Sequence, residues 1–333
     1  MIFEESYFRG EEKNGFYIRP MMKRYWAAHQ EVILEFDRVC KKLGVEYYAD
    51  FGTLLGAVRH RGFIPWDDDV DVCMLRGDYN RFRELATKEF QYGIMLYNDR
   101  KTSLAPLRII NTYAPQISEE FLSMYHGCPY SAGIDIYVLD RLPSSEKEKE
   151  SFRELHQTIK YAAQRTDKIY MSKEEHDQRY TDDAYDEAGF DRLLDVIEEA
   201  TSTKLTRDET LSNQLTNLLD RVQGMYWKEN NEDVVYMHGW ARKARTPLPE
   251  SYYRLPIALP FEKIEIMVPR CYDKVLKERF GNDYMTPVKQ IAAHEYPGYK
   301  KSQEILIDTF AQCGMTPPLN LIDELILETR DDV

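Results

Sequence analysis

The sequence of 333 residues lacks the features that mark several classes of protein. Its five cysteines form no C-x-x-C pair and lie far apart, so neither a disulfide framework nor a zinc site is indicated, and buried reduced thiols are expected. No stretch approaches the ~20 apolar residues of a membrane span. The first ten residues lack the basic and apolar regions of a secretory signal. We therefore expect a cytoplasmic protein without a transmembrane segment.

Positive charge is also scarce, with 44 Lys and Arg against 57 Asp and Glu and a formal net charge of −13. A surface with this balance repels a polyphosphate backbone, so nucleic acid is not an expected partner. We find no internal repeat and no low-complexity tract. The hydrophobic and charged fractions, 43% and 30%, are typical of a soluble globular protein. The length fits one α/β domain with an insertion, or two small domains.

The first hundred residues alternate between helical and extended patterns. A stripe of apolar residues predicts an amphipathic helix that Gly44 ends. The predicted elements are a helix over 28–43, a strand over 45–50, a turn at Gly52 and Thr53, a helix over 54–59, a strand over 69–75 and a helix over 78–90 that Asp78 caps. Further strands are predicted over 94–97, 104–110 and 133–139, which gives a mixed sheet with interleaved helices.

Between Ser144 and Asn231 the sequence becomes rich in charged residues with apolar residues at helical intervals. Ser145 and Glu148 have the spacing of a capping box. Strand patterns return over 233–240 and 261–269, and a helix is predicted over 272–280. The predicted fold is α/β (α+β), a mixed sheet with flanking helices and a helical insertion. We assign 1–143 to a catalytic core, 144–232 to the helical insertion or subdomain, and 233–333 to a C-terminal part that completes the core.

The densest functional signal is a run of acidic residues, in which Asp67, Asp68, Asp69 and Asp71 place four carboxylates within five positions. Such groups repel one another unless a cation compensates them, so the run favours a metal site. In a strand, Asp69 and Asp71 point the same way, ~6.5 to 7 Å apart, a spacing that suits Mg²⁺ or Mn²⁺. A solvated acidic turn is the alternative, and an EF-hand is excluded because Val72 stands where that loop requires glycine.

Two further features strengthen the metal interpretation. A turn at Gly52 and Thr53 that opens a helix would expose backbone N–H groups able to hold a phosphate. A third carboxylate, from Asp135 in a neighbouring strand, would complete the site. Arg59, His60, Arg61 and Arg108 are candidates for contacts with phosphate, although the first three could simply balance the acidic run.

The segment 52–71, with the sequence GTLLGAVRHRGFIPWDDDVD, closely resembles the signature of the LicD family. These are phosphocholine and related phosphotransferases of the nucleotidyltransferase superfamily, and they include the fukutin-type enzymes. Segments 108–112, 134–140 and 261–287 also resemble family motifs, so that the resemblance spans about residues 29 to 295. Val138 departs from the family pattern, which has proline there.

The resemblance implies a nucleotidyltransferase-like fold and transfer of a phospho-alcohol, phosphocholine first, from a CDP-linked donor. The acceptor would be a hydroxyl of a cell-surface glycan (lipopolysaccharide, teichoic acid or capsule) or of its lipid-linked precursor, and CMP would be released. The family's metal-binding Asp-x-Asp corresponds to Asp69 and Asp71, and its third catalytic aspartate to Asp135. Asp135 would share the metal or accept the proton of the incoming hydroxyl.

Several alternatives remain open at this point. The donor could instead be CDP-ribitol, CDP-glycerol or CDP-ethanolamine. A nucleotidyltransferase would use a nucleoside triphosphate and release pyrophosphate. A catalytically silent subunit would bind a nucleotide without turning it over. A lipid-linked acceptor would favour peripheral contact with the inner face of the membrane.

The remaining candidate residues have structural alternatives. Basic Arg242, Lys243 and Arg245 form a solvated surface or contact an acceptor phosphate. The candidates for an aromatic cage around choline, otherwise buried aromatics, are Trp66, Tyr125, Tyr130, Trp227 and Trp240. His126 and His294 either line the cleft or have ordinary surface roles.

Overall fold

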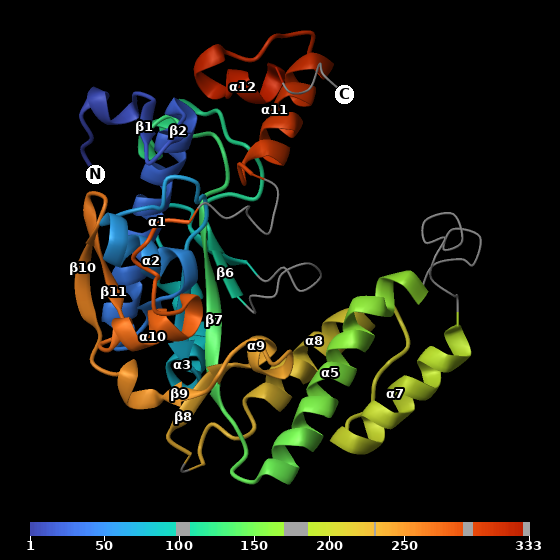
Figure 1. Ribbon diagram of the computed structural model, residues 1–333. Helices are drawn as coiled ribbons and strands as arrows, with labels where there is room; N and C mark the ends of the chain where they lie inside the picture. Colours follow the sequence, from blue (N-terminus) through green and yellow to red (C-terminus); the bar gives the residue numbers. More distant parts are fainter. Residues whose placement is uncertain (98–106, 170–185, 230, 289–295, 329–333) are drawn as a thin grey trace. The chain divides into compact units, whose positions relative to one another are not determined.

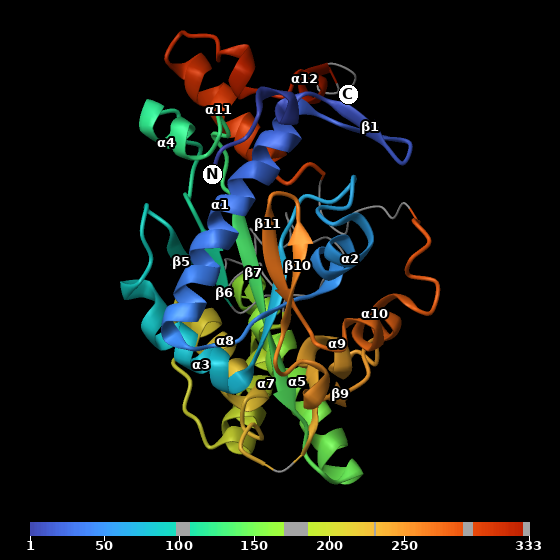
Figure 2. The same ribbon diagram turned by 90° about the vertical axis from the view of Figure 1, so that its left-hand side faces the viewer.

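The computed structural model describes residues 1–97, 107–169, 186–229, 231–288 and 296–328 (Figures 1 and 2). The chain forms two compact units. Unit 1 consists of Met1–Tyr97, Leu107–Tyr137 and Ser251–Val333, and unit 2 of Asn98–Pro106 and Val138–Glu250. Strand β7 (Gly133–Arg141) begins in unit 1 and ends in unit 2.

Unit 1 is built on a sheet whose strands follow the order β3-β4-β7-β6-β5. The strands of this path other than β7 are β3 (Tyr48–Ala49), β4 (Asp71–Leu75), β5 (Met95–Tyr97) and β6 (Leu107–Ile110). The pairs β3/β4, β5/β6 and β6/β7 are antiparallel. All five residues of β4 are buried, so this strand lies in the core of the unit. The predicted mixed sheet with flanking helices is confirmed.

The long helix α1 (Pro20–Leu43) packs against β11 (Ile264–Val268) and against α3 (Arg76–Leu85) (Figure 2). Proline suits its first position, and Gly44 ends it in the left-handed region at φ 63°, as predicted. The helix begins eight residues before the predicted start, because Met21, Met22, Tyr25 and Trp26 extend its buried face.

The structure corrects three local predictions at the start of the chain. Helix α2 (Phe51–His60) begins at Phe51, because Asp50 caps it, so Gly52 and Thr53 lie in its first turn and form no separate turn before it. Strand β4 begins at Asp71, so Asp69 lies in the preceding loop and not in the strand. Helix α3 starts two residues before Asp78, which therefore lies inside its first turn and is not the cap.

The rest of unit 1 consists of two hairpins and short helices. The predicted strand over 261–269 is the second half of a hairpin that β10 (Ile257–Phe261) forms with β11. Helix α10 (Tyr272–Phe280) ends at Gly281 as predicted. The other elements are η1 (Glu5–Phe8), β1 (Glu11–Lys13), β2 (Phe16–Ile18), η2 (Ala86–Lys88), α4 (Glu119–Met124), η3 (Glu250–Tyr252), which starts on the last residue of unit 2, α11 (Lys300–Gln312), η4 (Leu319–Leu321) and α12 (Glu324–Glu328).

Unit 2 contains the predicted helical segment, with α5 (Glu146–Ile169), α7 (Glu187–Thr201) and α8 (Leu211–Gln223) around a buried apolar cluster. The capping box at its start is confirmed, since the backbone N–H of Glu148 donates to Oγ of Ser145 at 3.2 Å. The end of β7 pairs with β8 (Asp233–Tyr236), which pairs with β9 (Leu248–Pro249). The predicted strand over 233–240 was too long, because α9 (Met237–Ala241) follows β8 directly.

The five cysteines are all free thiols. Cys40, Cys73 and Cys128 are buried as expected, whereas Cys271 is partly exposed and Cys313 is exposed. Among the helices that the structure describes, none is long and apolar enough to cross a lipid bilayer.

Candidate active site

Three consecutive carboxylates gather in the loop that precedes β4. Asp67, Asp68 and Asp69 each place one carboxylate oxygen within 4.8 Å of the other two. Side chains of neighbouring residues in an extended strand would point to opposite faces, so it is the loop that brings these three together. Within the acidic run the sequence favoured the pair Asp69 and Asp71, whereas the carboxylates that lie this close together are Asp67, Asp68 and Asp69.

The loop is fixed by contacts from distant parts of unit 1. The indole Nε1 of Trp26, on α1, donates to the carbonyl of Asp67 at 3.0 Å. The carboxylate of Asp68, only 2% exposed, accepts a hydrogen bond of 2.6 Å from the backbone N–H of Gly298. These contacts hold the acidic groups close to one another despite their mutual repulsion.

Asp71 lies at the first position of β4, against the first turn of α2. Its backbone N–H donates to Oγ1 of Thr53 at 2.8 Å, and its carbonyl accepts from the N–H of Asp50 at 3.1 Å. Burial raises the pKa of the Asp71 carboxyl well above its usual value, and the charges of Asp69 and Asp135 raise it further. The pKa of Asp67 is raised in the same way, by burial and then by Asp69 and Asp68.

Asp135 extends the acidic site onto β7. Its backbone N–H donates to the carbonyl of Val70 at 2.9 Å, so that it lies beside the start of β4. Residues of β7 alternate between buried and partly exposed, and Asp135 and Tyr137 share the partly exposed face. Arg108 stands directly opposite Asp135 on β6, and the two side chains form an ion pair.

Glycine at position 52 is explained by the approach of Asp67. A Cβ atom at Gly52 would overlap Oδ2 of Asp67, so only glycine allows this carboxylate to lie against the first turn of α2. The N–H groups of a first turn have no partner within the helix and carry partial positive charge, which favours an anion there. The buried hydroxyl of Thr53 accepts the hydrogen bond from β4, which leaves its backbone N–H in the first turn of α2.

A buried ion pair behind the site went unnoticed in the sequence. Asp50 accepts two hydrogen bonds from Arg279, of 3.0 Å to Nε and 2.8 Å to Nη2, and both side chains are 1% exposed. Burial alone would raise the pKa of Asp50, but the charge of Arg279 holds it below its usual value. The pair joins α10 to the start of α2, and nothing in the local sequence around either residue indicates it.

The donor set suits a hard divalent cation. The clustered carboxylates are those of Asp67, Asp68 and Asp69, and carboxylate oxygen is the ligand that Mg²⁺ and Mn²⁺ prefer. Asp71 is near enough for the charges of Asp69 and Asp135 to raise its pKa. The pKa values of Asp67 and Asp71 are raised first by burial and then by neighbouring carboxylates, and a bound cation would offset both effects. The residues present therefore fit the predicted metal.

Arg59 and Arg61 lie at the opposite end of α2 from Gly52, about 11 to 14 Å along the helix axis. Arg59 donates to the backbone carbonyls of Tyr284 at 2.9 Å and Thr286 at 3.4 Å. Arg61 is exposed. Of the predicted residues, Thr53 is hydrogen-bonded to Asp71, Arg108 is paired with Asp135, and Gly52 lies against Asp67. Arg59 and Arg61 lie at the other end of α2.

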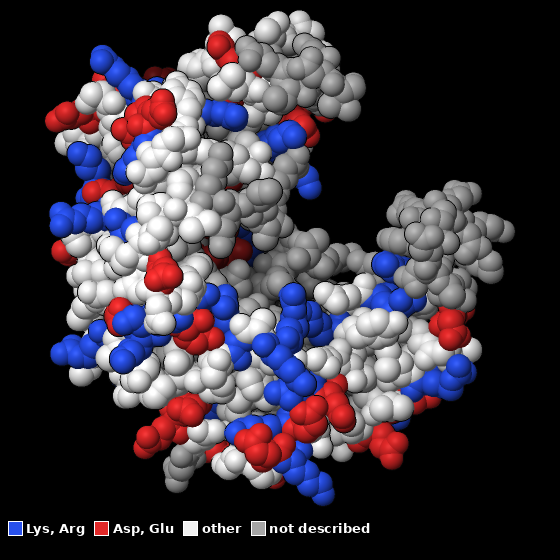
Figure 3. All heavy atoms as spheres, viewed as in Figure 1, with Lys and Arg blue, Asp and Glu red and all other residues white. Residues whose placement is uncertain are grey.

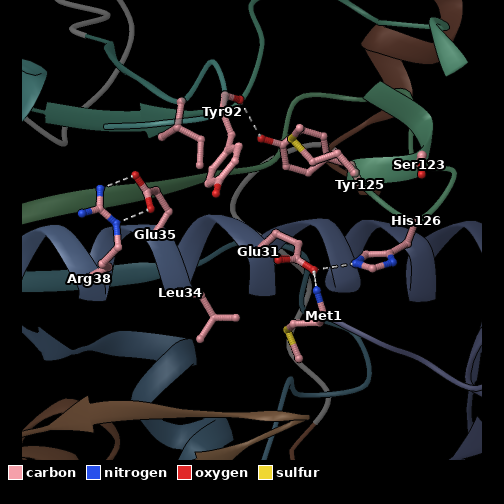
Figure 4. Close-up of a pocket in the computed structure, with 11 residues that line it drawn as sticks. Met1, Glu31, Leu34, Glu35, Arg38, Tyr92, Ser123, Tyr125 and His126 are labelled. Carbon is pink, nitrogen blue, oxygen red and sulfur yellow. Dashed lines mark hydrogen bonds and ion pairs between the residues drawn. The ribbon is translucent and has the colours of Figure 1, made fainter. Parts of the chain in front are cut away.

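Other candidate residues lie apart from the acidic cluster. His126 binds the carboxylate of Glu31 in a pocket of about 430 Å³ on another face of α1 than Trp26 (Figure 4). Tyr125 lines the same pocket and is buried, as is Tyr130, which stacks on Tyr299. His294 lies outside the described residues.

The basic residues Arg242, Lys243 and Arg245 belong to unit 2 and follow α9. Arg242 and Lys243 are exposed, whereas Arg245 is partly exposed and packs over Gly239. Lys and Arg side chains gather over the region of α9 in Figure 3. Trp240 is buried beneath Arg153, which lies 4.2 Å from its ring centroid.

Comparison with known proteins places these features in context. The sequence model described as "LicD/FKTN/FKRP, nucleotidyltransferase domain" matches residues 44–105, which include β3, α2 and the acidic loop. The chain is 24% identical over 258 residues to the lipopolysaccharide cholinephosphotransferase LicD of Haemophilus influenzae, covering 75% of this chain and 86% of that protein.

Two further relatives match shorter stretches of the chain. An uncharacterized protein of Rickettsia typhi is 37% identical over 70 residues, 21% of this chain and 23% of that protein. Human ribitol 5-phosphate transferase FKRP is 41% identical over 51 residues, 15% of this chain and 10% of that protein. The resemblance to the LicD family is therefore confirmed: the chain carries that family's nucleotidyltransferase domain match and is similar to a LicD cholinephosphotransferase over most of its length.

Proposed function

We propose that this protein is a metal-dependent phosphotransferase that moves a phospho-alcohol from a CDP-linked donor to a hydroxyl of a glycan or its lipid-linked precursor, with release of CMP. The observation that carries the proposal is the gathering of Asp67, Asp68 and Asp69 just before Asp71, which lies against the first turn of α2. Similarity to a lipopolysaccharide cholinephosphotransferase over 258 residues supports transfer of a phospho-alcohol to a glycan, with phosphocholine as the first candidate for the group transferred.

We assign the cation to Asp69, Asp71 and Asp135, with Asp67 and Asp68 beside them. Mg²⁺ or Mn²⁺ bound there would supply positive charge to offset the donor diphosphate and the leaving CMP. The first turn of α2, at Gly52 and Thr53, would bind a phosphate oxygen through backbone N–H groups. Together these residues would orient the donor for in-line attack.

Asp135 is our candidate for the group that accepts the proton of the attacking hydroxyl. It is partly exposed and therefore accessible to an acceptor, while its ion pair with Arg108 holds the carboxylate in place. Arg108 would also contact a donor phosphate as the acceptor approaches, because guanidinium binds phosphate as readily as carboxylate.

One specific observation favours a second donor. The match to a ribitol 5-phosphate transferase covers 51 residues only, yet at 41% identity. CDP-ribitol is therefore the first alternative to CDP-choline, followed by CDP-glycerol and CDP-ethanolamine. A nucleoside triphosphate with release of pyrophosphate is the alternative reaction, and a silent subunit the alternative without catalysis. A cytoplasmic location with peripheral contact at the inner face of the membrane would suit a lipid-linked acceptor.

The test is release of CMP by the purified protein, supplied with Mg²⁺ or Mn²⁺ and a panel of CDP-alcohols with water or glycan as acceptor. We expect release from one donor, and its loss by at least 100-fold in Asp71→Asn with the melting temperature preserved. Asp308→Asn, which removes one exposed carboxylate from α11, is the matched control and should keep full activity. Pyrophosphate from a nucleoside triphosphate, or near-wild-type turnover by Asp71→Asn, would contradict the proposal.

A further inference from the structure

The backbone is strained at the entrance to α2. Phe51, the first residue of this helix, has φ 46°, in the left-handed region that non-glycine residues seldom occupy. Such a conformation is energetically costly and persists only where the surrounding structure enforces it. Residues of this kind cluster at functional sites, which makes the surroundings of Phe51 informative.

Three contacts enforce the conformation. The carboxylate of Asp50 accepts a hydrogen bond of 2.8 Å from the backbone N–H of Phe51. The guanidinium of Arg279 lies 5.2 Å from the centroid of the Phe51 ring, within the range of a cation–π contact. The ring of Tyr137 approaches edge-on, with 5.1 Å between the centroids and an interplanar angle of 66°. The Phe51 side chain is thus held in one place.

The two aromatic rings form a corner at the edge of the acidic site. Phe51 precedes Gly52, against which the carboxylate of Asp67 lies, and Tyr137 is two residues from Asp135 on the same face of β7. Both rings are partly exposed. Anything bound through phosphate at the first turn of α2 would therefore have its next chemical group beside Phe51 and Tyr137.

The charge around the corner selects among ligand groups. Arg279 already provides a positive charge at the Phe51 ring, and its side chain is 1% exposed. A second cation, such as a quaternary ammonium, would compete for a ring that the guanidinium already contacts, although the charge of that guanidinium is paired with Asp50. A flat ring can instead pack against both aromatic side chains.

We propose that Phe51 and Tyr137 bind the nucleobase of the nucleotide donor and so contribute to donor specificity. This inference rests on the proposed function, since it gives the base-binding part to the same site. The strained backbone of Phe51, fixed by Asp50 and Arg279, sets the ring in position before the ligand arrives, which lowers the entropic cost of binding.

The experiment measures binding of CMP and of ribose 5-phosphate, which lacks the base, by calorimetry in the presence of Mg²⁺. In Phe51→Leu, the affinity for CMP should fall roughly 5- to 150-fold, the range found when one base loses its aromatic partner. The affinity for ribose 5-phosphate should stay within about twofold. Tyr137→Leu should behave in the same way, and Phe51→Tyr should keep most of the affinity for CMP.

A matched control separates base contact from backbone strain. Tyr92 is also an aromatic residue at positive φ, 59°, and is 65% exposed away from the acidic cluster. Tyr92→Leu should leave the binding of both compounds unchanged. Leucine carries no branch at Cβ, so it tolerates the backbone conformation at position 51 as phenylalanine does. It loses the ring contacts with Arg279 and Tyr137, so the melting temperature of Phe51→Leu should fall by a few degrees while the affinity for ribose 5-phosphate is kept.

The outcomes distinguish this inference from the proposed function. Selective loss of CMP binding in Phe51→Leu supports base binding even if no CDP-alcohol is turned over, a result that would contradict only the proposed function. Unchanged CMP binding in Phe51→Leu, or an equal loss of CMP and ribose 5-phosphate, overturns the inference and leaves the proposed function standing. If the wild-type protein binds no CMP, both fail.

Discussion

The ion pair between Asp50 and Arg279 provides the most direct test of how the site is supported. The perturbation is Arg279→Met, which removes the guanidinium and fills much of its volume. Asp50 would keep its hydrogen bond from the N–H of Phe51 but would lose both bonds from Arg279. A carboxylate with 1% exposure would then stay in the interior without its counter-charge.

The expected magnitude follows from this burial. Removal of one partner from a buried ion pair costs about 3–5 kcal/mol, because the other charge remains unpaired. At about 2–4 °C per kcal/mol for a unit of this size, the melting temperature should fall by about 6–20 °C. Lys277→Met, in the same helix, breaks an exposed pair of 2.8 Å with Asp273 and should leave the melting temperature nearly unchanged.

The pH dependence gives the sign of the effect independently. In the wild type the pKa of Asp50 is depressed, so its pairing stabilises the fold above the carboxyl's unfolded pKa and is lost as the pH falls through the folded pKa. In Arg279→Met burial raises that pKa instead, so the loss of stability should be larger at pH 7.5 than at pH 4.5. Thermal unfolding at both pH values measures it. The reasoning would be refuted if the melting temperature of Arg279→Met fell by less than about 2 °C at pH 7.5. It would also be refuted if the double variant Asp50→Asn/Arg279→Met regained none of the lost melting temperature.

Two further predictions concern the acidic cluster. Gly52→Ala should displace the carboxylate of Asp67 and lower the rate of CMP release at least tenfold. The melting temperature should change by only a few degrees, because alanine favours the helix by about 1 kcal/mol relative to glycine. An unaltered rate of CMP release would contradict the close approach of these two residues. Because the pKa values of Asp67 and Asp71 are raised, the metal-free protein loses stability as the pH rises through these pKa values. Mg²⁺ should therefore raise the melting temperature more at pH 7.5 than at pH 5, and Asp71→Asn should reduce the increase that Mg²⁺ produces. An equal increase in the wild type and in Asp71→Asn would argue against a metal at Asp71.

Local sequence was sufficient for features that depend on neighbouring residues. The glycine that ends α1, the capping box at Ser145 and the alternation that turns Asp135 to the partly exposed face of β7 were all predictable. The start of α2 was misjudged because the cap, Asp50, stood inside what looked like a strand. The start of α1 was predicted too late, because its buried face extends toward the N-terminus beyond the apolar residues from which the helix was predicted.

What the sequence by itself determined is the set of chemical groups: a run of carboxylates that favours a cation, and a glycine before it. Which carboxylates gather, and what stands beside them, was decided by the tertiary structure. Arg279 reaches Asp50 across 229 positions, the hydroxyl of Thr53 is hydrogen-bonded to β4, and Arg59 donates to the backbone carbonyl of Tyr284. The physical reason is that charge and hydrogen-bonding capacity belong to each residue, whereas burial and partners arise only when distant segments pack together.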